Sequence, residues 1–229
     1  MWSTSLAPTS MVAVARSRGL FLMEAVWSRF LPAYTTIVDI LASGSVGEPS
    51  MVDAEFGFSL PVMPDHRLFD RSLGGGALLD LGIYPLQLCS LVLGPVEHIR
   101  GLGTIGSTGV DEQVAAISTH ENGGLGIIRA GIRTQLACSA RISSSKGSIA
   151  LPAFMHCPDY LIVSDKTGER RIDCPVGEHG LRFEIEEIHR CLNAGKLESS
   201  VMPLDESMSL AATMDTIRRQ IGLSYPGES

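Results

Sequence analysis

Apolar residues recur along this chain with two different periods, and the change of period separates helical from strand-like parts. Apolar positions three and four residues apart, in runs that end at glycine or in a turn-rich segment, predict helices. Alternating apolar and polar residues between turn residues predict strands. The expected helices span residues 11–18, 30–42, 74–93, 182–193 and 205–221. The expected strands span residues 20–23, 51–58, 97–105, 111–121, 125–133, 136–143, 147–151, 160–165 and 169–174.

Turn and capping residues support several of these boundaries. Gly19 and Gly222 are expected to end helices, and Asp205 is expected to cap the start of the last one. Residues 59–73 predict an irregular loop, and the ENGG sequence at 121–124 predicts a hairpin turn. A meandering antiparallel sheet between helical segments indicates an α+β domain.

Composition excludes several classes of protein. The 229 residues are 45% hydrophobic and 19% charged, which is typical of a globular protein with a core of its own. The net charge of −7 argues against binding to nucleic acid or to an anionic membrane surface. The apolar stretch 81–96 is shorter than the ~20 residues of a membrane span and is interrupted by Pro85 and Gln87. We therefore expect neither partner.

The cysteines and histidines show no metal-ligand spacing, so no metal site is predicted. The five cysteines are widely spaced and include no CxxC pair, which predicts reduced thiols and a cytoplasmic location. His156 and Cys157 stand side by side, but Pro158 and the strand context favour packing over a thiol nucleophile.

Asp80 and Tyr84 are the best candidates for acid–base chemistry. Residues four apart share a helix face, so the carboxylate and the phenol can point into one pocket. A phenol needs a neighbour that stabilises its anion before it can transfer protons at neutral pH. The alternative is a buried tyrosine bonded to a carbonyl, with an aspartate near the helix start. Spacing alone favours that alternative.

Two further patterns allow both a functional and a structural interpretation. The sequence GLGTIG at 101–106 fits the GxGxxG fingerprint, but the residues after it favour a strand over the helix that a dinucleotide site requires. Trp27 beside Arg29 can line a pocket for a polar, ring-shaped ligand, as can Phe56. On these residues alone, core packing with a surface arginine is favoured.

Two long segments resemble the Gfo/Idh/MocA oxidoreductases. They read LFLMEAVWSRFLPAY at residues 20–34 and GGGALLDLGIYPLQL at residues 74–88. The chain is similar in particular to the branch of trans-dihydrodiol dehydrogenases, also called NADP-dependent D-xylose dehydrogenases. The chain also resembles glucose–fructose oxidoreductase, a related branch of the same family. Further matches are VGEP at 46–49, AEFG at 54–57, TGVDEQ at 108–113, KGSIALP at 146–152 and the ending, 186–228.

This resemblance implies a two-domain enzyme. A Rossmann domain would hold NADP, and a C-terminal α+β domain would line the substrate pocket. The open, largely antiparallel sheet of that domain would form a homodimer. The resemblance implies Tyr84 as the proton donor, assisted by Asp80, and Trp27 and Phe56 as walls of a pocket for a sugar or cyclic diol. Arg29 belongs to the same motif as Trp27, and we expect it to contact the substrate.

The chain departs from the family pattern at its beginning. The family's early GxGxxG and Glu-Lys-Pro motifs are missing, and no lysine precedes Lys146. We therefore expect residues 1–24 to be a remnant of the end of a dinucleotide-binding domain, and residues 25–229 to be the substrate-binding and dimerisation domain. Cofactor-binding residues stay unknown, and we expect no cofactor to bind this chain alone.

Two interpretations stay open. The first is the substrate half of an NADP-dependent oxidoreductase for CH–OH groups of sugars or cyclic diols, inactive by itself. The second is a non-catalytic binding or oligomerisation module that could pair with a full-length relative. In either case, the helix that bears Asp80 and Tyr84 is expected to face a cleft open to solvent.

Overall fold

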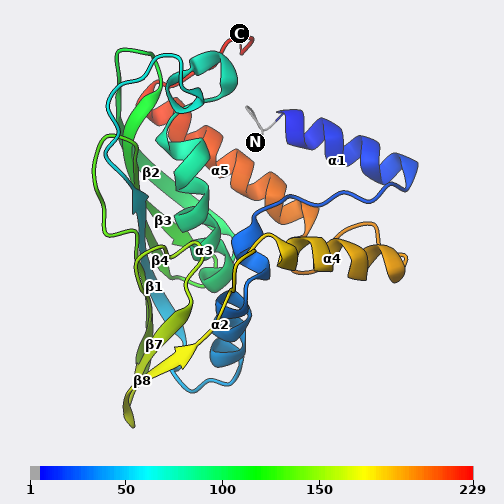
Figure 1. Ribbon diagram of the computed structural model, residues 1–229, viewed down its shortest axis with the longest axis vertical. Coiled ribbons are helices and arrows are strands. Elements are labelled where there is room, and N and C mark those ends of the chain that lie inside the picture. Colours follow the sequence, from blue (N-terminus) through cyan, green and yellow to red (C-terminus); the bar gives the residue numbers. More distant parts are fainter. Residues whose placement is uncertain (1–5, 229) are drawn as a thin grey trace.

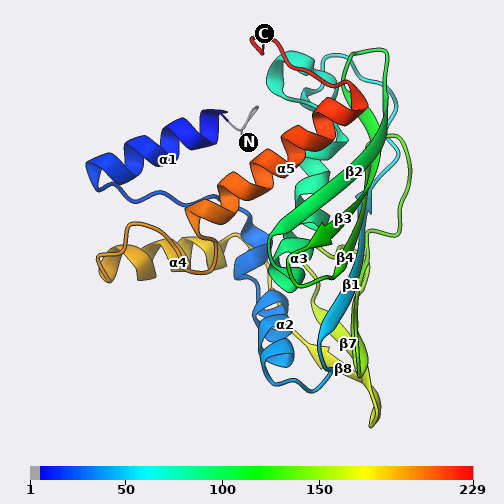
Figure 2. The ribbon, with the colours of Figure 1, turned by 180° about the vertical axis from the view of Figure 1, so that it is seen from behind.

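In the computed structural model, which describes residues 6–228, an open eight-stranded sheet carries helices on one face (Figures 1 and 2). The strands lie in the order β2-β3-β4-β1-β5-β6-β7-β8, and all neighbours are antiparallel except β1 and β4. Their bounds are Pro49–Gly57 (β1), Val96–Ile105 (β2), Asp111–His120 (β3), Leu125–Gly131 (β4), Ala140–Ser144 (β5), Gly147–Leu151 (β6), Tyr160–Asp165 (β7) and Gly168–Asp173 (β8). The expected α+β class, with an open and largely antiparallel sheet, is confirmed.

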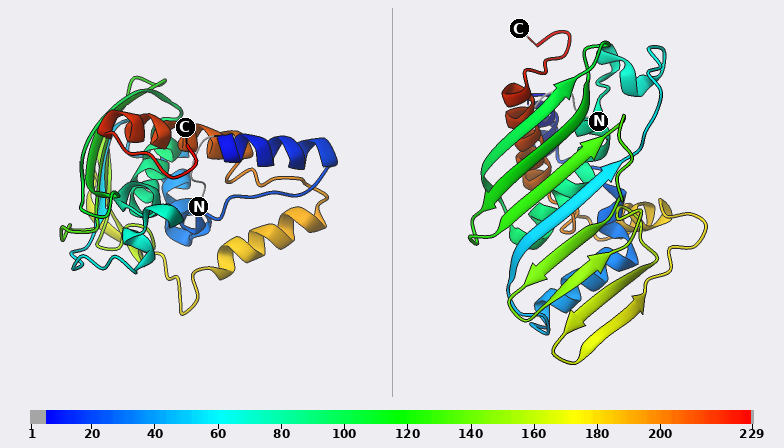
Figure 3. Two further views of the ribbon diagram at one scale, coloured as in Figure 1. Left: turned by 90° about the horizontal axis from the view of Figure 1, so that it is seen from above. Right: turned by 90° about the vertical axis from the view of Figure 1, so that its left-hand side faces the viewer.

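The helices form a second layer on one side of this sheet. α3 packs against β1 and β4, and α5 packs against β2, whereas α1 and α4 extend away from the sheet (Figure 3). The long helices are α1 (Leu6–Arg18), α2 (Pro32–Ala42), α3 (Ile83–Leu93), α4 (Arg182–Asn193) and α5 (Leu204–Ile221). The short ones are the 3₁₀ helices η1 (Trp27–Phe30), η2 (Arg67–Phe69) and η3 (Arg71–Leu73), and the π-helical turn η4 (Leu78–Gly82).

The parallel pair β1–β4 explains why α3 is so apolar. Parallel neighbours need a long crossover connection, and the chain between β1 and β4 includes α3, which lies on the sheet beneath both strands. The stretch Arg71–Leu93 is long and apolar enough to cross a membrane, but most of it is buried inside the protein. Burial of this kind is the mark of a core helix.

The opposite face of the sheet carries no helix among residues 6–228 (Figure 3). Along β3 the side chains alternate, as the pleat requires: Val114 and Ala116 are buried, and Ala115 and Ile117 are exposed. Ile117 is 56% exposed, and Leu102 on β2 is 82% exposed. Apolar side chains therefore stand on the open face of the sheet.

Two expected strands differ from the observed ones. Residues 20–23 form no strand: Leu22 donates its N–H to the Leu197 carbonyl, and no described strand lies beside this segment to complete a ladder. The strand expected from residue 136 begins at Ala140, because Cys138 has a φ of 54° and interrupts the extended backbone.

The start of α5 also differs from expectation. The residue before its first turn is Pro203, not Asp205. Asp205 lies within the first turn, where its carboxylate favours the positive end of the helix dipole. Its side chain pairs with Arg16 of α1 at 2.8 Å. The expected end of the helix at Gly222 is confirmed by a φ of 73° there.

The glycine run 74–76 forms a turn and not the start of a helix. Gly76 has a φ of 123°, and a Cβ on it would lie 2.0 Å from Asp111 Oδ1. The Asp111 carboxylate occupies this space and accepts a hydrogen bond from the Leu78 N–H at 2.7 Å. Gly76 therefore allows a buried carboxylate to hold the start of η4, which leads into α3.

Replacing Gly76 should cost more stability than replacing its neighbour Gly74. Gly74 also has a positive φ, of 71°, but a Cβ there would meet nothing within 4 Å. Gly74→Ala should cost about 1 kcal/mol of unfolding free energy, from backbone strain alone. Gly76→Ala adds the clash with Asp111 and should cost about 3 kcal/mol or more. Urea unfolding of both variants measures the difference, and equal losses would show that Asp111 can move aside freely.

Candidate functional site

Four ring side chains from different parts of the chain meet beside the start of α3. Trp27 comes from η1, Phe56 from β1, Tyr84 from the first turn of α3 and His156 from the segment after β6. The Tyr84 ring centroid lies 5.5 Å from that of Phe56 and 5.4 Å from that of His156. The Trp27 Nε1–H donates a hydrogen bond to the Tyr84 hydroxyl at 3.0 Å. These four residues are called the aromatic cluster below.

Three members of this cluster were predicted from the sequence, and the fourth was not. His156 stacks on Phe56 with 4.4 Å between centroids and 16° between planes, and it meets Trp27 edge-on at 5.7 Å. The interpretation of His156 as plain packing is therefore incomplete, because its ring faces the predicted site residues. No local pattern marks this residue. The fold brings it there from 72 positions beyond Tyr84.

Tyr84 is only partly buried, and a pocket of about 270 Å³ opens beside it. Burial raises the pKa of the Tyr84 phenol, the hydrogen bond from Trp27 lowers it, and the charge of Asp80 raises it. The phenol is thus protonated at neutral pH, with an N–H donor already placed to stabilise its anion. The pocket is also lined by Met23, Glu24, Ala25, Val26, Ile83 and Met214.

Asp80 lies near Tyr84 but has a partner of its own. Its Oδ1 accepts a hydrogen bond from Arg67 Nη1 at 2.6 Å, and no hydrogen bond joins it to the Tyr84 hydroxyl among the described residues. Asp80 stands in the π-helical turn η4, which precedes the turn of α3 that holds Tyr84. The Asp80 side chain is 17% exposed, whereas that of Arg67 is 64% exposed. Arg67 is a neighbour that the sequence pattern did not indicate.

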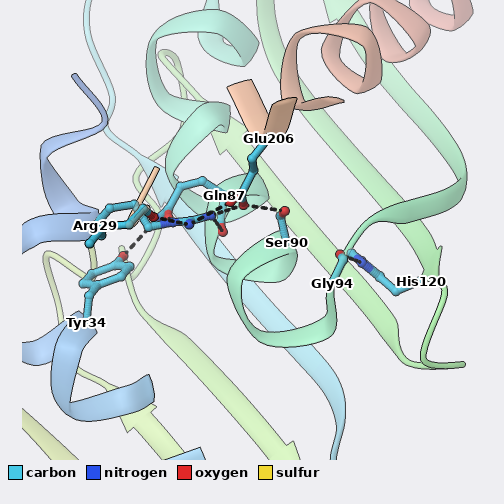
Figure 4. A network of polar contacts seen from close by, with 8 residues as sticks. Arg29, Tyr34, Gln87, Ser90, Gly94, His120 and Glu206 are labelled. Atoms are coloured by element: carbon cyan, nitrogen blue, oxygen red, sulfur yellow. Dashed lines mark hydrogen bonds and ion pairs between the residues drawn. The ribbon is translucent and has the colours of Figure 1, made fainter. Parts of the chain in front are cut away.

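Arg29 lies away from the aromatic cluster, in a buried ion pair. Its side chain is 1% exposed, and its guanidinium is paired with Glu206 of α5. It also donates to the Gln87 side chain and, at 2.9 Å, to the Gln87 carbonyl (Figure 4). Groups of α3 and α5 therefore engage the donors of Arg29, and the expected contact with a substrate stays a prediction.

The network around Arg29 extends toward the segment that carries His156. Gln87 Nε2 donates to the Tyr34 hydroxyl at 3.2 Å (Figure 4). That hydroxyl donates to the Met155 carbonyl at 3.0 Å. Ser28, next to Trp27, donates its hydroxyl to the His156 carbonyl at 2.5 Å. Hydrogen bonds therefore hold the backbone on both sides of the His156 peptide against η1 and α2.

The GxGxxG sequence at 101–106 has no phosphate-binding geometry. Residues 101–105 lie within β2, and the Gly101 N–H donates to the Gln220 side chain of α5 at 2.6 Å. A Cβ on Gly101 would lie 2.8 Å from Ile217, so this glycine serves close packing of α5 on the sheet. Among residues 6–228, no group of three or more His, Cys, Asp and Glu side chains could hold a metal ion.

Removing the Trp27 hydrogen bond should raise the pKa of Tyr84. The indole N–H stabilises the phenolate, so Trp27→Phe removes the one effect that lowers this pKa. A titration with ¹³C-labelled tyrosine followed by NMR measures the shift. Phe56→Leu is the matched control, because it changes a ring contact to Tyr84 without removing a donor. An unchanged or lower pKa in Trp27→Phe would contradict this description of the site.

Replacing one partner of the Arg29–Glu206 pair should lower the unfolding free energy far more than its share of replacing both. Arg29→Met leaves the Glu206 carboxylate without its partner, and Glu206→Gln does the same to Arg29. Each should lower the unfolding free energy by about 3–5 kcal/mol. The double variant Arg29→Met/Glu206→Met should lose clearly less than the sum of the single variants. Urea unfolding measures all three. The exposed Arg16–Asp205 pair is the control, and Arg16→Met should change stability little. Additive losses would contradict the coupling.

Comparison with known proteins identifies the family of this chain. Residues 34–150 match the family described as GFO/IDH/MocA C-terminal domain. The chain is 38% identical to human trans-1,2-dihydrobenzene-1,2-diol dehydrogenase over 94% of its length and 66% of that enzyme's. It is 37% identical to the zebrafish (Danio rerio) enzyme of the same name, over 96% of the chain and 67% of that protein. The chain thus spans about two thirds of the length of these relatives.

Solved structures share the fold at lower sequence identity. An aldose–aldose oxidoreductase from Caulobacter crescentus superposes with a TM-score of 0.84 and 18% identity, covering 96% of this chain and 67% of that one. A 3-ketoreductase from Actinomadura kijaniata, in complex with NADP and TDP-benzene, gives 0.83 and 22%, covering 96% and 68%. The expected resemblance is thereby confirmed. The chain belongs to the GFO/IDH/MocA family of oxidoreductases and includes its C-terminal domain.

Proposed function

We propose that this chain is the substrate half of an NADP-dependent oxidoreductase that acts on CH–OH groups of sugars or cyclic diols. The Trp27–Tyr84 hydrogen bond carries the proposal, because it gives a partly exposed phenol the donor that proton transfer requires. The ring walls of the aromatic cluster suit the apolar face of a ring-shaped substrate. The dihydrodiol dehydrogenases among its relatives support the same substrate class.

In this proposal, the Tyr84 hydroxyl exchanges a proton with the reacting hydroxyl of the substrate. Tyr84 donates its proton when an alcohol forms, and as the phenolate it accepts the proton when an alcohol is oxidised. The Trp27 N–H stabilises this phenolate in both directions. Asp80, held by Arg67, orients the polar side of the site, and Phe56 forms a wall. Arg29, paired with Glu206, positions η1 and thereby Trp27.

The glycine fingerprint at 101–106 does not fit a dinucleotide. The glycine fingerprint lies in β2, so no turn at a helix N-terminus presents N–H groups to a pyrophosphate there. We propose that NADP is held by a dinucleotide-binding domain other than residues 25–229, and that residues 1–24 are the end of such a domain. Of these, residues 1–5 lie outside the described residues. The exposed apolar residues Met11, Val14 and Leu20 support a missing partner for this segment.

We further propose that the open face of the sheet forms a homodimer, or pairs with a full-length relative. Leu102, Ile117 and Leu125 expose apolar side chains on it, and no described helix covers them. The location we propose is the cytoplasm, since the five cysteines are all free thiols.

A titration with NADPH, followed by NADPH fluorescence, tests whether cofactor binding requires a domain other than this chain. The 229-residue chain should show no saturable binding. Joined to the part of the human relative that this chain does not match, it should oxidise a cyclic diol with NADP⁺. Tyr84→Phe in this hybrid should lower the rate about a hundredfold or more. A matched Tyr160→Phe variant should not, because Tyr160 lies on β7 outside the aromatic cluster.

Two results would overturn parts of this proposal. Saturable NADPH binding by the chain alone would place a dinucleotide site within it. A hybrid that binds NADPH but turns over no sugar or diol would favour the non-catalytic binding or oligomerisation module.

A further inference from the structure

The His156 side chain is held by ring contacts but has no polar partner among residues 6–228. Its ring is stacked on Phe56, edge-on to Trp27 and tilted by 59° to Tyr84. Its backbone is held by Ser28. Its Nδ1 is buried without a hydrogen-bond partner among the described residues, although the ring as a whole is only partly buried. A polar ring held rigidly with unused hydrogen-bonding capacity is poised to bind a ligand.

The surroundings of His156 decide which kind of ligand suits it. Burial lowers the pKa of His156 to about 4, so its imidazole is neutral at physiological pH. A neutral imidazole offers one N–H donor and one acceptor. A substrate hydroxyl can both donate and accept, so it matches either ring nitrogen. A carboxylate or phosphate would need a positive charge, which this ring does not carry.

The position of His156 also decides which hydroxyl it would meet. Tyr84 binds the reacting hydroxyl in the proposed function, and the His156 ring lies 5.4 Å from the Tyr84 ring, centroid to centroid. The Tyr84 phenol and the His156 imidazole thus belong to the same aromatic cluster, and the pocket of about 270 Å³ opens on its Tyr84 side. A substrate with hydroxyls on neighbouring carbons could address both at once, whereas a simple alcohol could address only one.

We propose that the His156 imidazole hydrogen-bonds a second substrate hydroxyl, on the carbon next to the reacting one, and so selects vicinal diols over simple alcohols. This inference rests on the proposed function, since it takes Tyr84 as the residue that meets the reacting hydroxyl. It makes His156 a specificity-determining residue. Phe56 holds the imidazole plane, and the Trp27 and Tyr84 rings pack beside it.

The test compares trans-1,2-cyclohexanediol with cyclohexanol, which lacks only the second hydroxyl. Each is titrated into the ¹⁵N-labelled chain and followed by NMR of the Trp27 indole and the His156 ring nitrogens. Both compounds should shift the Trp27 indole signal, but only the diol should shift the His156 nitrogens. His156→Phe keeps the stacked ring without hydrogen bonds, so it should weaken diol binding roughly tenfold more than it weakens cyclohexanol binding.

The outcomes separate this inference from the proposed function. If both compounds shift Trp27 but the diol leaves His156 unchanged, or if His156→Phe binds the diol as tightly as the unaltered chain does, the inference is wrong and the pocket stands. If neither compound shifts the Trp27 signal, the proposed substrate site at the aromatic cluster is wrong, and this inference is wrong with it. The wild-type measurement does not depend on whether His156→Phe folds.

Discussion

The buried charge of Arg29 is the constraint on which the rest of this domain depends. A guanidinium that is almost fully removed from water needs an opposite charge and hydrogen-bond acceptors. Glu206 on α5 supplies the charge, and the Gln87 oxygens on α3 accept hydrogen bonds. The pair joins three elements that are far apart in the sequence. One of them, η1, carries Trp27, and another, α3, carries Tyr84. The ion pair therefore sets the distance across which the Trp27–Tyr84 hydrogen bond forms.

The same network reaches the fourth member of the aromatic cluster. Gln87 connects to Tyr34, and Tyr34 holds the carbonyl next to His156. The site consequently stands on packed helices and on hydrogen-bonded backbone, not on loops alone. Rigid support of this kind is what a group that must meet a substrate hydroxyl at a fixed distance requires.

The sequence predicted most elements but only part of the site. The helical period of 182–193 and the alternation along β3 were enough to place those elements, because local patterns set them. Trp27, Phe56 and Tyr84 could be named through their motifs. His156 and Arg67 could not, because only the folded chain brings them to Tyr84 and Asp80. Glu206 lies 177 residues from Arg29, so no local pattern could reveal that Arg29 is occupied. The strand expected at 20–23 failed for a related reason, since a strand needs a neighbouring strand.

A crystal structure of the chain with trans-1,2-cyclohexanediol tests the central claim most directly, because it locates the substrate pocket without requiring turnover. Our account predicts the diol among Trp27, Phe56, Tyr84 and His156, with one hydroxyl at the Tyr84 oxygen. A diol bound elsewhere, such as on the open face of the sheet, or an aromatic cluster without the Trp27–Tyr84 hydrogen bond, would contradict it.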